Sequence, residues 1–294
     1  MDDLYRPSQT RHSVDEHYAT ELSPIATWHR VTREAVSCSH QRAPEGITLW
    51  VPQTSFEMQV HGFAPFVANP CSLILLHPRF RFDRRVLHDD WLQADEVRAP
   101  INLIERGTLS DNGAGEALTL PWMHLDAEAY VNLRRALALP SPLKESALQR
   151  WIATVLQLAR IEWRKRPLPR QSIIEQSGHP SRFALAQAIA QRLDQAEARG
   201  GGLDDLAEHF GVSSFHLLRV FRRVMGTTPH QYFLQLRLRR ALLQIDQGRE
   251  RIVDIALAAG FSSHGHFSTA FRKAFGCSPL EFQRGQQKLA GNRR

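Results

Sequence analysis

Residues 252–276, which read IVDIALAAGFSSHGHFSTAFRKAFG, decide the fold of the C-terminal third because their apolar residues follow a helical period. In the second half of this stretch, apolar residues recur at i, i+3, i+4, i+7 and i+8, as on one face of an amphipathic helix: Phe267, Ala270, Phe271, Ala274 and Phe275. Ser263 stands at the position of an N-cap, and Gly276 stands where the helix is expected to end. Residues two apart on a helix lie on nearly opposite sides, so His264 and His266 are not predicted to share a metal ion.

The same pattern occurs once before in the chain. Residues 203–211 align with residues 252–260 at an offset of 49, and residues 213–229 align with residues 263–279 at an offset of 50. The identical pairs are Asp205/Asp254, Ala207/Ala256, Gly211/Gly260, Ser213/Ser263, His216/His266, Phe221/Phe271, Arg222/Arg272, Gly226/Gly276 and Pro229/Pro279. The sequence therefore predicts two copies of one structural unit.

Each copy is predicted to be a short helix, a turn and a longer helix. In the first copy the short helix covers residues 203–210, and Ser213 caps a helix that runs to Met225. This is the helix-turn-helix unit, whose second helix enters the major groove of DNA. The candidate DNA-binding residues of copy one are Ser214, Phe215, His216, Leu218, Arg219, Arg222 and Arg223, with His216 placed beside the core or a phosphate. Those of copy two are His264, Gly265, Ser268, Thr269, Arg272 and Lys273.

A third helix is predicted between the copies, from Pro229 to about Ile245, with Gly248 just past its end. About 17 residues at about 1.5 Å each span about 26 Å. Together with the flanking units, this length predicts recognition helices about one DNA turn apart, at about 34 Å. One chain is thus expected to enter two successive major grooves.

The charge distribution points to the same part of the chain. Residues 200–294 contain 14 lysines and arginines against 7 acidic residues, an excess that equals the net charge of +7 of the whole 294-residue chain. The remaining residues are balanced in charge. This asymmetry favours a polyanion partner for the C-terminal third, most simply nucleic acid.

These residues resemble the AraC/XylS family of bacterial transcription regulators over about residues 182–288. The motif parts that carry the resemblance are Ile255-Ala256, Gly260-Phe261-Ser262-Ser263, Phe267, Phe271-Arg272-Lys273, Gly276 and Pro279, with their counterparts from Ser213 to Pro229. The resemblance implies a regulator, usually an activator, that binds double-stranded promoter DNA through both units and contacts RNA polymerase. Many members carry arginine or another long polar residue in the second recognition helix, where this chain has Gly265, Ser268 and Thr269.

The N-terminal two thirds are predicted to begin with β-strands and to end with helices. Apolar stretches at residues 47–51, 56–61 and 72–77 are bounded by proline or glycine, as in a barrel or sandwich. The fold class is therefore α+β, with a β-rich domain at residues 1–178 and an all-α domain at residues 182–288. The latter contains helix-turn-helix units at about 203–225 and 251–275, joined by the linker helix. The resemblance implies that the first domain is a cupin-like sensor for a small effector.

Helical periodicity begins after about residue 126. Five apolar residues form a stripe within residues 145–164: Leu148, Ile152, Val155, Leu156 and Ala159. Two interpretations remain open: the stripe pairs two chains in a homodimer, or it packs on its own barrel. Residues 167–180 are expected to be a loop-rich connection, residues 181–198 a helix, and Gly200 to Gly202 a flexible joint.

Other signals in this region are weak. His61, His77, His88 and His124 each stand alone, so they are interpreted as structural, and neither a metal nor another cofactor is predicted. The basic stretch at residues 79–85 is interpreted as a solvated loop or edge strand rather than an anion site. Cys71 is expected to be a buried thiol, and three scattered cysteines favour a reducing cytoplasm. No secretory signal and no apolar stretch long enough to cross a membrane is recognised.

Three functional hypotheses follow. The favoured one is a transcription regulator that is not an enzyme. A cupin-type metal enzyme with a helical appendage is the alternative, although its strand His-x-His is missing. A DNA-repair protein of the alkylation-damage type needs a four-cysteine zinc site, which three cysteines cannot supply.

Overall fold

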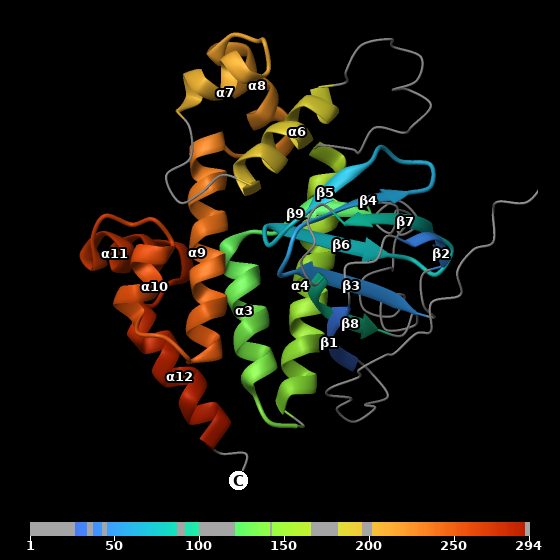
Figure 1. Cartoon of the computed structure of the whole chain (residues 1–294). Coiled ribbons are helices and arrows are strands. Elements are labelled where there is room, and N and C mark those ends of the chain that lie inside the picture. The colour runs from blue at the N-terminus through green and yellow to red at the C-terminus, as the bar shows by residue number, and fades with distance from the viewer. Residues whose placement is uncertain are drawn as a thin grey trace, which may run out of the picture.

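Two antiparallel β-sheets form the N-terminal part of the molecule (Figure 1). The computed structural model describes residues 27–33, 38–42, 46–86, 92–99, 121–141, 143–165, 182–195 and 202–291. One sheet has the strand order β1-β8-β3-β6-β9 and the other has the order β2-β7-β4-β5. The strands are β1 (Thr27–Arg33), β2 (Cys38–Arg42), β3 (Ile47–Pro52), β4 (Phe56–Val60), β5 (Phe66–Ala68), β6 (Ser72–Leu76), β7 (Arg81–Val86), β8 (Leu92–Ala99) and β9 (Trp122–His124).

Aromatic side chains fill the space between the two sheets. The indole of Trp50 on β3 makes edge contacts with Phe56 and Phe82 of the other sheet, with ring centroids 6.4 and 5.8 Å apart. The ring centroids of Phe66 on β5 and Trp122 on β9 lie 6.1 Å apart. Such pairs contribute about 0.5–1.5 kcal/mol each beyond their buried area. The two sheets therefore share one apolar core, as expected for a β-rich domain.

The strands predicted at residues 47–51, 56–61 and 72–77 are confirmed as β3, β4 and β6. The interpretation of residues 79–85 as a solvated loop or edge strand was wrong. Residues 81–86 form β7, which pairs with β2 on one side and β4 on the other. Within it Phe82 and Arg84 are buried, so alternate side chains face the core, while Asp83 pairs with His61. Pairing with neighbouring strands on both sides therefore places this charge-rich sequence in the interior of a sheet.

Two helices, α3 (Ala127–Ala138) and α4 (Leu143–Lys165), pack on each other beside the sheets. The Asp126 side chain caps α3 by accepting a hydrogen bond from the Ala129 amide at 2.6 Å. All five residues of the predicted α4 stripe are at most 4% exposed within this one chain: Leu148, Ile152, Val155, Leu156 and Ala159. The homodimer interpretation of the stripe was therefore wrong, because these side chains belong to the core of the chain itself.

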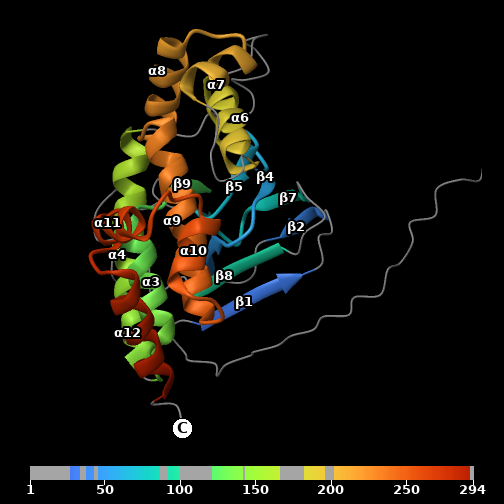
Figure 2. The ribbon, with the colours of Figure 1, turned by 60° about the vertical axis from the view of Figure 1, so that its left-hand side comes forward.

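The C-terminal part is entirely helical in the described residues. Its helices are α6 (Arg182–Gln195), α7 (Leu203–His209), α8 (Ser214–Met225), α9 (Pro229–Gln247), α10 (Ile252–Ala258), α11 (His264–Phe275) and α12 (Pro279–Gly291). Figures 1 and 2 show α7 and α8 at one end of the long helix α9, and α10 and α11 toward the other. The predicted limits of α9 are confirmed to within two residues, with Pro229 at its start and Gly248 in the left-handed conformation after its end. The predicted connection at 167–180, together with Gly200 and Gly201, lies outside the described residues.

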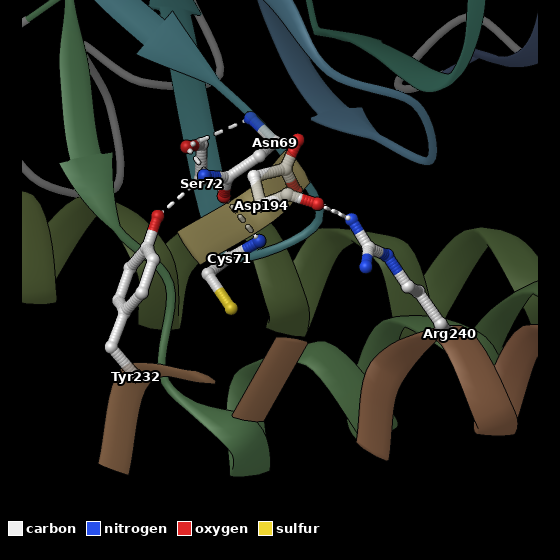
Figure 3. A network of polar contacts seen from close by, with 6 residues as sticks. All are labelled: Asn69, Cys71, Ser72, Asp194, Tyr232 and Arg240. Atoms are coloured by element: carbon white, nitrogen blue, oxygen red, sulfur yellow. Dashed lines mark hydrogen bonds and ion pairs between the residues drawn. The ribbon is translucent and has the colours of Figure 1, made fainter. Parts of the chain in front are cut away.

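Buried polar groups attach α9 to the β-rich part. The guanidinium of Arg239, which is fully buried, donates to the carbonyl oxygens of Pro70, at 2.6 Å, and Leu125, and it lies 4.9 Å from the centre of the Tyr130 ring. Asn69 donates to the hydroxyl of Tyr232 (Figure 3). A buried donor without a partner costs about 1–3 kcal/mol. These contacts therefore favour one position of α9 against the β-rich part over positions in which the donors have no partner.

A buried ion-pair network extends this attachment. Arg134 on α3 is 3% exposed and pairs with Asp95 of β8 at 2.6 Å and with Asp246 at the end of α9. Outside this buried network, Asp194 of α6 pairs at 2.7 Å with Arg240 of α9, whose side chain is 41% exposed (Figure 3). Removal of one member of a buried pair leaves an uncompensated charge and typically costs 3–5 kcal/mol.

The buried thiol predicted at Cys71 is confirmed. Cys71 is 1% exposed, and desolvation by burial raises its thiol pKa to about 11, against the opposing effect of Arg239. A thiol with this pKa stays protonated at neutral pH and is a poor nucleophile.

Candidate DNA-binding interface

The two helix-turn-helix units share a hydrogen bond and a left-handed glycine at their turns, although the turn of copy two is one residue longer. In copy one the Val212 amide donates to the Ala207 carbonyl at 3.0 Å, and in copy two the Phe261 amide donates to the Ala256 carbonyl at 3.0 Å. Gly211 and Gly260 sit at φ 62° and 78°, a conformation that favours glycine. The predicted internal repeat is therefore present in the structure as well as in the sequence.

Caps fix both ends of each recognition helix. The hydroxyls of Ser213 and Ser263 accept hydrogen bonds from the amides of His216 and His266, each at 3.2 Å. At the other end, Gly226 and Gly276 adopt φ 75° and 73° and close the helices. Apolar residues on the inner faces anchor the helices: Leu217, Val220, Phe221 and Met225 in α8, and Phe267, Phe271 and Phe275 in α11.

The outer face of α8 presents large side chains to solvent. Phe215 is 72% exposed, and the guanidinium of Arg219 lies 5.8 Å from the centre of its ring. Both side chains are therefore available to a partner at the outer face of α8. Arg222 and Arg223 are also exposed. The other candidates on α8 are half-buried: Ser214, whose hydroxyl donates to Asp204 at 2.5 Å, together with His216 and Leu218.

The outer face of α11 presents shorter groups. Gly265 occupies the position equivalent to Phe215, and a Cβ added there would meet no atom within 4 Å. The Thr269 hydroxyl donates back to the Gly265 carbonyl at 3.0 Å, which leaves it without a free proton for an outside acceptor. Ser268 is half-buried, whereas His264 and Lys273 are exposed.

Arg272 is exposed but has an acidic neighbour in its own chain. Its guanidinium lies 3.4 Å from the Glu281 carboxylate at the start of α12. Hydrogen bonds from the backbone and hydroxyl of Ser278 lower the pKa of Glu281, with a smaller effect from Arg272, so this carboxylate is ionised at neutral pH. His266, expected beside the core or a phosphate, is exposed and contacts Phe261 edge-on at 5.5 Å.

Not all of the C-terminal positive charge is available to a polyanion. Arg239 and Arg240 hold α9 to the rest of the molecule, as described above. Arg237 donates to the Ala259 carbonyl at 2.6 Å and lies 4.3 Å from the centre of the Phe261 ring, which fastens the turn of copy two to α9. The local sequence does not indicate this positioning role, because a charged residue in a helix is ordinarily exposed to solvent.

Three of the four isolated histidines have protein partners. His61 pairs with Asp83 at 3.0 Å, His77 accepts from the Arg79 amide at 3.1 Å, and His124 contacts Gln235 at 3.0 Å. Burial, with a smaller contribution from Arg79, lowers the pKa of His77. His88 lies outside the described residues. Within the described ranges no three His, Cys, Asp or Glu side chains converge as metal ligands, and no helix there is long and apolar enough to cross a membrane.

The C-terminal helical region is similar to domains of known proteins. Residues 206–285 match a family model described as a helix-turn-helix domain, which covers both units. A solved structure from Chromobacterium violaceum, a transcriptional regulator with an AraC-type DNA-binding domain, is 35% identical; the likeness covers 36% of this chain and 91% of that one, with a TM-score of 0.31. The helix-turn-helix region of this chain is therefore of the AraC type.

Curated transcription regulators are similar to part of the chain. The HTH-type transcriptional regulator ArgR of Pseudomonas aeruginosa is 44% identical over 78 residues, which are 26% of this chain and 24% of that protein. The HTH-type transcriptional activator RhaS of Escherichia coli O139:H28 is 37% identical over 83 residues, 28% of this chain and 30% of that protein. The chain thus spans about a quarter to a third of these relatives.

Proposed function

We propose that the chain is an activator of transcription that reads one promoter site with both recognition helices. The observation that carries this proposal is the exposure of the outer faces of α8 and α11 on two units with equivalent caps and turn hydrogen bonds. The 19 residues of α9 span about 28 Å, which suits entry into two successive major grooves on one face of the duplex.

The proposed contacts divide into two kinds. Base reading is assigned to Ser214, Phe215, Leu218 and Arg219 in copy one, and to His264, Gly265, Ser268 and Thr269 in copy two. Phosphate contacts are assigned to His216, Arg222, Arg223, Arg272 and Lys273, because such contacts position the protein without specifying sequence. RNA polymerase is the proposed second partner.

Residues 1–178 are proposed as the sensor domain and residues 182–288 as the DNA-binding domain, with control by a small effector. The interdomain contacts of Arg239 and Arg134 support such control, because they connect the β-rich part to α9 directly. A homodimer would form through a surface other than the α4 stripe, which is buried.

The experiment that tests the proposal is binding of the full chain to duplex DNA at several salt concentrations. Neutralisation of several phosphates makes the logarithm of the binding constant fall with the logarithm of salt, by about 0.9 per phosphate. Replacement of both Arg219 and Arg223 with alanine is expected to weaken binding, whereas Arg192→Ala on the exposed surface of α6 is the matched control. Salt-insensitive binding, or equal loss in the control, contradicts the proposal. Transcription with purified polymerase then distinguishes an activator from a repressor.

A further inference from the structure

A surface groove of about 490 Å³ lies where α12 meets α3 and α4. Its apolar lining includes Trp151, Phe282 and Leu289. The indole of Trp151 is fixed, because its Nε1–H donates to the Ala129 carbonyl at 2.8 Å, and Phe282 is 4% exposed. The groove is therefore bounded by helices of the proposed sensor on one side and by the last helix of the DNA-binding region on the other.

The charged groups of the groove favour an anion. Arg135 on α3 and Arg150 on α4 line it, and both are exposed. The Arg135 guanidinium contacts the sulfur of Cys277 at 3.3 Å, and in the described part of the chain no acidic side chain pairs with Arg150. The one acidic lining residue, Glu281, already accepts from the Ser278 amide at 2.7 Å and from the Ser278 hydroxyl at 2.8 Å. Two cations are thus left available to a ligand.

The wall formed by α12 contains a glycine in mid-helix. Gly285 lines the groove, and a Cβ added there would meet no atom within 4 Å. Glycine lowers helix stability relative to alanine, and here no neighbouring atom of the chain requires it. Its effect is to keep the groove open at this point.

We propose that this groove binds a small organic anion with an apolar body. The anionic head pairs with Arg135 and Arg150, for which a carboxylate has the matching bidentate geometry. The body lies against Trp151 and Leu289 and passes Gly285. A ligand held between α3, α4 and α12 couples the β-rich part to the second helix-turn-helix unit. Only this coupling rests on the proposed function; the binding itself does not.

The test uses 2-naphthoate and its uncharged analogue 2-naphthamide as probes, with calorimetry on the full chain without DNA. Saturable binding of one naphthoate is expected, with the amide at least tenfold weaker because it lacks the charge. The double variant Arg135→Gln/Arg150→Gln should weaken naphthoate binding at least tenfold, whereas Arg192→Gln on α6 should leave it unchanged. No saturable binding of naphthoate, or equal affinity in the double variant, overturns the proposal.

A second variant tests the role of space rather than charge. Gly285→Leu should fill the groove and reduce the affinity for both probes at least tenfold, while the circular dichroism spectrum stays that of the parent. Unchanged naphthoate affinity in this variant also overturns the proposal. DNA binding is measured separately on the probe-free protein. Absence of probe binding and absence of DNA binding are therefore distinguished.

Discussion

The two recognition helices have equivalent caps and equal lengths but different surfaces. Equivalent serine caps, glycine ends and turn hydrogen bonds hold α8 and α11, yet Phe215 and Arg219 in the first correspond to Gly265 and Thr269 in the second. The fold constrains the inner positions, where a side chain must fill a core, and leaves the outer positions free to differ. Duplication of a unit therefore does not imply duplication of its contacts, and we expect copy one to read bases more strongly than copy two.

The largest expected effect tests whether the inner faces are equivalent. Phe221 and Phe271 occupy matching positions, and both are fully buried. Replacement of either with alanine should lower the free energy of unfolding by about 3–5 kcal/mol, because a large cavity is left. Urea unfolding of the two variants measures this. A loss below 1 kcal/mol in one copy alone would break the structural equivalence of the units.

The next effect tests the outer face of copy one. Arg219→Ala should cost about 1–3 kcal/mol of discrimination between the preferred site and a site altered in one half, as expected for a lost bidentate pair with guanine. Competition binding with the two duplexes measures it, with Arg192→Ala as the control. If discrimination is unchanged while affinity falls for both duplexes, Arg219 contacts phosphate instead.

Gly265 allows a sharper test of copy two. Gly265→Ala should raise the free energy of unfolding by about 0.5–1 kcal/mol, because the added Cβ meets open space and alanine favours the helix. Thermal and urea unfolding check the stability. A simultaneous loss of DNA affinity would indicate that DNA approaches the backbone closely at this residue. Unchanged affinity would indicate that DNA does not contact the backbone here.

The smallest expected effect concerns a phosphate contact. Lys273→Ala should weaken binding to all duplexes alike and flatten the salt dependence by about one unit, because one fewer phosphate is neutralised. Titrations at four salt concentrations, with preferred and unrelated duplexes, give both quantities. A loss confined to the preferred duplex would move Lys273 into the base-reading group.

The sequence predicted the helix-turn-helix units almost to the residue because their signals are local. Ser213, Gly226, Ser263 and Gly276 are caps whose hydrogen bonds or backbone angles depend only on neighbours in the chain. Strands β3, β4 and β6 were predictable for the same reason, since apolar runs end at proline or glycine.

The features that the sequence did not reveal depend on distant partners. Strand β8 contains Asp95 and Glu96, which are buried because Arg134 and Trp50 satisfy them from other elements. The burial of Arg239 likewise requires the carbonyls of Pro70 and Leu125, which no local pattern indicates. The stripe on α4 was correctly identified as apolar, but periodicity alone does not say whether the covering surface belongs to the same chain or to a second copy.

The most direct test of unequal base reading is selection from a randomised-site DNA library with the full chain, Arg219→Ala and the double variant Ser268→Ala/Thr269→Ala. The account predicts that Arg219→Ala relaxes base preference in one half of the selected site. The double variant should retain most of the preference in the other half, because the Thr269 hydroxyl already bonds to the Gly265 carbonyl. If the double variant erases more base preference than Arg219→Ala, copy two is the principal reader and the assignment is contradicted.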